Sequence, residues 1–74
     1  MMTETFQIRT YGKGELAQLY APHVTPAAAC RKLMHWISLQ PQLVEDLKRY
    51  GLTENSRTFT PIQVRLIVAA LGEP

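Results

Sequence analysis

The sequence predicts a small, mainly α domain: a bundle of about four helices containing a helix-turn-helix-like pair, with a short N-terminal β segment. Four stretches repeat apolar residues at helical spacing. Two Thr-Pro pairs, at 25–26 and 60–61, mark helix starts, because threonine caps free amides and proline is tolerated at the first helical position. A chain of 74 residues suffices for one domain. We therefore expect a single domain over 1–74, with 6–74 folded and 1–5 disordered.

The N-terminal β segment is predicted at Phe6 to Tyr11, where apolar and polar side chains alternate. Gly12 and Gly14 are expected to end it. The polar loop 52–59 is expected to finish in a short extended piece that pairs with residues 6–10. Tyr11, beside the glycines, is the one aromatic residue that we do not place in the core.

The first helix of the helix-turn-helix-like pair is predicted from Glu15 to Ala21, and Pro22 stops it because proline lacks an amide donor. Its inward residues are Leu16, Leu19 and Tyr20. The second helix should run from Pro26 to about Leu39. Its apolar face collects Ala29, Cys30, Leu33, Trp36 and Ile37, with Met34 on the border. Its opposite face holds Ala28, Arg31, Lys32, His35 and Ser38.

Two more helices are predicted after this pair. The third spans Pro41 to Tyr50, and Gly51 follows where a left-handed residue is expected. Its inward residues are Leu43, Val44, Leu47 and Tyr50. The fourth spans 61–71, with Gln63 at the capping-box position and Gly72 as its stop. Since this fourth helix is apolar almost all round, it is either a central helix or a subunit interface.

The titratable residues argue against an enzyme. Catalysis needs convergent groups, whereas Glu45 and Asp46 are adjacent and splay apart on a helix. His23 and His35 have no nucleophile to activate. Cys30 and His35 point to different faces of one helix, so a buried, apolar cysteine is the better interpretation. We expect no catalysis, no metal site and no cofactor.

The compartment follows from what the sequence lacks. Cys30 is the only cysteine, which excludes an internal disulfide and fits a reducing compartment. The N-terminus has no apolar run typical of a secretion signal. No apolar stretch approaches the roughly 18 residues that span a bilayer. The sequence predicts a cytoplasmic protein with no membrane partner.

Positive charge is concentrated on the helix-turn-helix-like pair. The net charge is +2, and residues 9–39 hold four Lys or Arg against Glu15 alone, whereas residues 40–74 hold four of each sign. Binding of double-stranded DNA through helix 26–39 is therefore our first hypothesis. Arginine can bond bidentately to guanine, and alanine can meet a thymine methyl group. The candidate nucleic-acid-binding residues are Lys13, Thr25, Ala28, Arg31, Lys32 and His35. Lys13 and Thr25 are expected to hold phosphates, together with the free amides at the helix start. Ala28 allows close approach, and Arg31, Lys32 and His35 face the groove.

The alternative is a protein–protein interaction or adaptor module. Many helix-turn-helix motifs place glycine in the turn, whereas this chain has the longer Ala-Pro-His-Val. In the alternative, helix 61–71 binds a protein partner or forms a homodimer, and the basic face is merely solvated. Tyr11 is a second candidate contact for such a partner.

Three segments carry a resemblance to a known family. YGKGELAQLYAP, AAACRKLMHWI and FTPIQVRLIVAALGEP resemble short bacterial proteins of the Bacteroides group, a family defined as a domain of unknown function. The resemblance extends from about Phe6 to Pro74 and implies a small, mostly helical bacterial protein. The Lys-x-Glu-Leu-Ala start is also similar, more loosely, to bacterial helix-turn-helix domains. Neither resemblance implies an activity, a cofactor or a binding residue.

Overall fold

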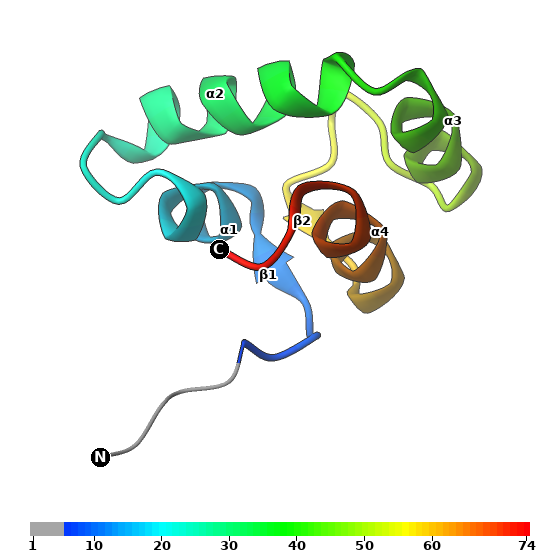
Figure 1. Cartoon of the computed structure of the whole chain (residues 1–74), viewed down its shortest axis with the longest axis horizontal. Helices are drawn as coiled ribbons and strands as arrows, with labels where there is room; N and C mark the ends of the chain where they lie inside the picture. Colours follow the sequence, from blue (N-terminus) through cyan, green and yellow to red (C-terminus); the bar gives the residue numbers. More distant parts are fainter. Residues whose placement is uncertain (1–5) are drawn as a thin grey trace.

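The computed structural model describes residues 6–74, and these form a mainly α domain of four helices with a two-stranded β segment (Figure 1). The expectation of disorder in residues 1–5 lies outside the described residues. The elements follow the order β1 (Tyr11–Gly12), α1 (Lys13–Tyr20), α2 (Pro26–Ser38), α3 (Pro41–Arg49), β2 (Thr58–Phe59) and α4 (Pro61–Leu71). The predicted fold class is confirmed.

The β segment is shorter than predicted and is shifted along the chain. Strands β1 and β2 pair antiparallel, with Tyr11 opposite Phe59, so loop 52–59 does supply the partner strand. Residues 6–10 are not part of a strand, and Gly12 belongs to β1 instead of ending it. Helix α1 starts at Lys13, two residues before the predicted start. The Glu15 carboxylate accepts a hydrogen bond of 3.1 Å from the Gly12 amide and so stabilises this earlier start.

Tyr11 was expected outside the core, and that prediction is wrong. Its side chain is only 4% exposed. The Phe6 ring stacks on it with centroids 5.4 Å apart, and the Tyr11 hydroxyl donates to the Gln7 carbonyl at 2.9 Å. Segment 6–10 therefore folds back over the ring, and the burial could not be predicted from the neighbouring glycines.

The predicted helix caps are confirmed. The Thr25 side chain accepts from the Ala28 amide at the start of α2, and Thr60 and Gln63 form a capping box at the start of α4. Gly51 and Gly72 follow α3 and α4 with φ of 96° and 87°, a left-handed conformation that side chains rarely adopt. These local signals set the helix boundaries almost as predicted.

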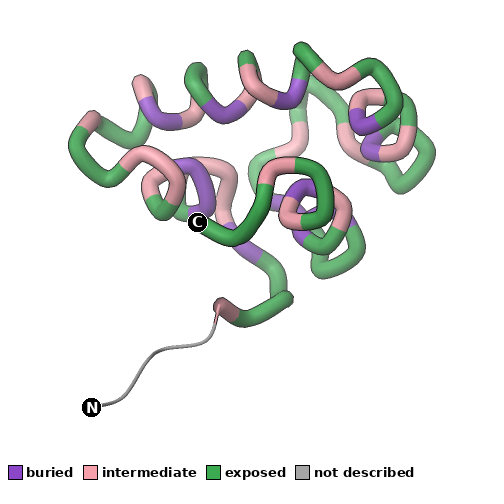
Figure 2. The backbone as a smooth tube through the Cα atoms, in the orientation of Figure 1, coloured by how far each residue is buried: buried purple, intermediate pink, exposed green. Residues whose placement is uncertain are grey.

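Helix α2 covers one side of the molecule, with α1 and α4 beneath it and α3 beyond its C-terminal end (Figure 1). Its buried residues face these helices, and its outer side is exposed (Figure 2). The core between the elements consists of Tyr11, Leu16, Ala17, Ala29, Leu33, Ile37, Leu43, Leu47, Phe59, Val64 and Ile67. Helices α1 and α2 make the most extensive contact between any two elements. Helices α1 and α2 are thus packed as a unit.

Two residues predicted to face inward do not. Leu19 is 46% exposed, because α1 packs through Leu16 and Ala17, and Leu19 is turned by about 200° from Ala17. Tyr50 is 49% exposed, because α3 ends one residue before it. The remaining inward residues of α3 are buried or half-buried as predicted.

Helix α4 is not enclosed on all sides. Gln63, Val64 and Ile67 are buried, whereas Ile62 and the alanines at 69 and 70 are exposed. Helix α4 is therefore not a central helix, which was the first of the two alternatives given for its apolar character. Within residues 6–74 no helix has both the length and the apolar character that crossing a membrane requires.

Candidate functional site

The predicted site residues Ala28, Arg31, Lys32 and His35 lie together on the outer side of α2, and we call them the basic face. Arg31, Lys32 and His35 are exposed, and Ala28 is half-buried. Ala28 precedes Arg31 by three residues and Lys32 by four, so it is a neighbour of both on the helix surface. His35 continues the row of Arg31, whereas Lys32 lies about 100° around the helix from Arg31. The basic face is therefore a row with Lys32 on its flank.

Among residues 6–74, no ion pair involves a side chain of the basic face. The sequence has no Asp or Glu from residue 16 to residue 44. The single ion pair among residues 6–74 joins Arg9 to Glu15 at 2.9 Å, outside α2. Asp46, an acidic residue of the neighbouring helix α3, accepts a hydrogen bond from Gln42 of its own helix. The cations of the basic face are thus free to meet an anionic partner.

The start of α2 offers fewer free amides than we expected. Pro26 has no N–H, the Ala28 amide donates to Thr25 Oγ1 at 3.2 Å, and the Ala29 amide donates to the Thr25 carbonyl at 2.8 Å. Within the described part of the chain, the amides of Thr25 and Ala27 remain without a protein acceptor. The exposed Thr25 hydroxyl accepts from Ala28, and its own proton remains available for donation.

Lys13 lies apart from the basic face. Its backbone amide donates to the Arg57 carbonyl at 3.0 Å, which extends the β pairing into α1. Its ammonium lies 6.0 Å from the centroid of the Phe59 ring. The structure therefore brings four of the six predicted residues together, with Thr25 at the N-terminal end of the same helix and Lys13 on another element.

The turn between α1 and α2 is held from both sides. Gln18 Nε2 of α1 donates to the Val24 carbonyl in the turn at 3.1 Å. Ala17, a small residue of α1, is fully buried. A Cβ atom on Gly14 would lie 3.5 Å from the Pro26 ring, so the two helices also approach closely there. The longer, proline-containing turn is thus compatible with a fixed helix pair.

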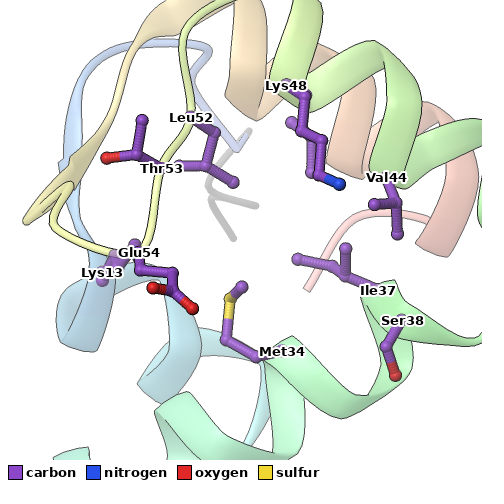
Figure 3. A pocket seen from close by; sticks show the side chains of 10 residues that line it. Lys13, Met34, Ile37, Ser38, Val44, Lys48, Leu52, Thr53 and Glu54 are labelled. Carbon is purple, nitrogen blue, oxygen red and sulfur yellow. The ribbon is translucent and has the colours of Figure 1, made fainter.

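A cavity that the sequence did not predict lies between α2, α3 and the loop that follows α3. Its volume is about 240 Å³ (Figure 3). It is lined by Lys13, Met34, Ile37, Ser38, Val44, Leu47, Lys48, Leu52, Thr53 and Glu54. These residues come from four segments, and only their tertiary arrangement brings them together. The only hint in the sequence was the position of Met34 at the border of the apolar face of its helix.

Among residues 6–74, no three side chains of His, Cys, Asp or Glu come together in a group that could hold a metal ion. Cys30 is a half-buried free thiol that packs against the core. The two features that could bind a partner or a ligand are therefore the basic face and the cavity.

Comparison with known proteins places the chain in a family. The model of a family described as "Domain of unknown function (DUF4248)" matches residues 7–74, almost the whole chain. No curated protein and no solved structure matches the chain.

Proposed function

Because the chain belongs to the DUF4248 family, whose description names no activity, we propose its function from the geometry: it binds double-stranded DNA through the basic face of α2. The observation that carries the proposal is an exposed helix face with three cationic or titratable side chains and no acid between residues 16 and 44. DNA binding depends largely on Lys and Arg neutralising phosphates. An unneutralised basic helix on the outside of the molecule meets that requirement.

The helix itself suits the major groove. That groove is about 12 Å wide and admits one α-helix. Ala28 is small enough for close approach, and Arg31, one turn further along, has the planar fork that bonds two guanine acceptors. His35 extends the same row. Thr25, at the leading end of α2, is proposed to donate its hydroxyl proton to a phosphate, and Lys13 to contact the backbone from α1.

The packing of α1 supports this use of α2. In Figure 1, α2 lies across the view while α1 is seen nearly along its axis, so the two helices cross instead of running side by side. Crossing helices joined by a short turn are the arrangement of helix-turn-helix domains. Since the Gln18 bond holds the turn, α2 is presented on a rigid support.

The test is a binding titration of a fluorescent mixed-sequence duplex. We expect the double variant Arg31→Ala, Lys32→Ala to lose about tenfold or more in affinity. The matched control is Arg49→Ala, Arg65→Ala, which removes the same charge from exposed positions outside α2. Equal binding by both double variants, or no binding by the wild type, contradicts the proposal.

A second candidate function is supported by the outer side of α4. Ile62 is 39% exposed, Ala69 and Ala70 are exposed, and Arg65 is the only charged residue of the helix. Exposed apolar surface of this kind marks protein contacts. In this candidate function, two copies of the chain form a homodimer through α4. Sedimentation of the wild type and of Ile62→Lys tests it, and a wild type that stays monomeric at high concentration excludes it.

A further inference from the structure

The cavity between α2, α3 and the following loop has an apolar interior that the chain does not fill. Leu47 is fully buried and Ile37 is 3% exposed, so these two form its back wall. Met34, Val44 and Leu52 are half-buried, so solvent reaches them. In Figure 3 the Ser38 and Thr53 hydroxyls point away from the cavity. Water in it therefore finds few partners, and an apolar group that displaces this water gains affinity.

Two charged side chains border the cavity on opposite sides. Lys48 lies near the end of α3, and the carboxylate of Glu54, from the loop, lies near Met34 (Figure 3). Lys48 is exposed and has no carboxylate within ion-pair distance among residues 6–74. Lys13 is a second lysine among the lining residues. With two cations and one anion, the site favours a ligand that carries one negative charge.

We propose that this cavity binds a small aromatic carboxylate, with the ring against Met34, Val44 and Leu52 and the carboxylate at Lys48. The ring is favoured over an alkyl chain because the Met34 side chain points into the cavity, and thioether sulfur makes favourable contacts with aromatic rings (Figure 3). The volume of about 240 Å³ lies just below the range of about 300–1,000 Å³ for drug-sized ligands, so the ligand is a single ring with a short side chain. Of the six residues of the proposed DNA contact, only Lys13 also lines this cavity.

The test is a titration of the ¹⁵N-labelled full chain, followed by NMR, with three probes of one shape: 3-phenylpropionate, 3-phenylpropanamide and 3-phenylpropylamine. We expect the carboxylate to bind most tightly, with saturable shifts at residues 34, 37, 44, 47 and 52. Since contacts between exposed charges are weak, Lys48→Gln should reduce its affinity by about two- to fivefold. Arg49→Gln, one residue along the same helix and outside the lining, is the matched control and should change nothing.

Two further variants make the proposal falsifiable. Glu54→Gln should strengthen binding of the carboxylate by removing a like charge, whereas a ligand that needs a cationic group would bind more weakly. Val44→Phe should fill the cavity and abolish the shifts, with circular dichroism confirming that the helices remain. Equal affinity for the three probes, equal behaviour of the Lys48 and Arg49 variants, or no saturable shifts overturns the proposal.

Discussion

The side-chain amide of Gln63 donates a hydrogen bond of 2.9 Å to the backbone carbonyl of Tyr50 and so joins the start of α4 to the end of α3. The Oε1 atom of the same side chain accepts from the Thr60 amide at 2.9 Å. Gln63 is only 3% exposed and is the one buried polar side chain among the described residues. Its two bonds satisfy backbone groups at both ends of a chain reversal, which makes it a fixed point between the last two helices.

The substitution Gln63→Ala should therefore lower the free energy of unfolding more than is usual for a residue at a helix start. It removes half of the capping box and leaves the Tyr50 carbonyl without its donor, so we expect a loss of about 2–3 kcal/mol in the free energy of unfolding. Urea unfolding followed by circular dichroism measures it. The control is Gln42→Ala, an exposed glutamine that bonds Asp46 within α3, where the loss should stay below about 0.5 kcal/mol. Similar losses in both variants would contradict a special role for Gln63.

Gln63 also shows which contacts can be predicted from the sequence and which cannot. The capping box spans four residues, so its spacing alone predicts it. The bond to Tyr50 joins residues thirteen positions apart and depends on the path of the intervening loop, which carries no such signal. The predictions for the burial of Tyr11 and of Leu19 are wrong for the same reason. Which side of a short segment is buried is decided by the elements that pack on it, and these are not adjacent in the sequence.

The candidate site divides in the same way. Helical periodicity places Arg31 and His35 on one exposed row without any tertiary information, and this part of the site was predicted. The contribution of the helix start was overestimated, because the capping bond of Thr25 occupies the Ala28 amide. The cavity could not be predicted at all, since α2, α3 and a loop form it together.

The Arg9–Glu15 pair predicts a loss of stability in acid. The Arg9 guanidinium, at 2.9 Å, and the Gly12 amide hold the pKa of Glu15 below its usual value of about 4.5. A carboxyl whose pKa is lower in the folded state stabilises the fold above its unfolded pKa, and this contribution disappears as the pH falls through the folded pKa. The stability difference between wild type and Glu15→Gln should accordingly shrink as the pH falls from about 6 to about 3.

Urea midpoints at several pH values measure this difference. The effect should be small, because the two side chains are 47% and 51% exposed and solvent screens them. Glu45→Gln, at an exposed position of α3, is the control and should show no comparable pH dependence. A Glu15→Gln difference that stays constant with pH would show that the pair does not contribute.

The hydroxyl of Tyr20 donates to the Gly72 carbonyl and so ties the end of α4 to α1. Tyr20→Phe should cost about 0.5–1.5 kcal/mol, whereas Tyr50→Phe, at a 49% exposed ring, should change stability by less than about 0.5 kcal/mol. Burial, followed by the charge of Glu73, raises the pKa of Tyr20. Its contribution should be complete below the unfolded pKa of about 10 and should disappear as the pH rises through the folded pKa. Unfolding at pH values on both sides of this window tests both points, and a Tyr20→Phe variant as stable as Tyr50→Phe would contradict them.

The positions of Arg31 and Lys32 on α2 predict different roles in the proposed DNA complex. Arg31 lies in the row with Ala28 and His35, so it should face the base edges, and Lys32, about 100° around the helix, should face a phosphate strand. Arg31→Ala should then cost about 1–3 kcal/mol on the preferred duplex and narrow the differences between sequences. Lys32→Ala should weaken binding to all duplexes alike and lower the magnitude of the salt slope, d log K/d log[salt], by about 0.9.

Titrations of two duplexes at several salt concentrations separate these roles. Arg49→Ala, outside α2, should leave both the sequence preference and the salt slope unchanged. If Arg31→Ala weakens all duplexes alike, the row from Ala28 to His35 does not face the bases. In that case α2 binds along the phosphate backbone, where the charge of the basic face acts without sequence preference.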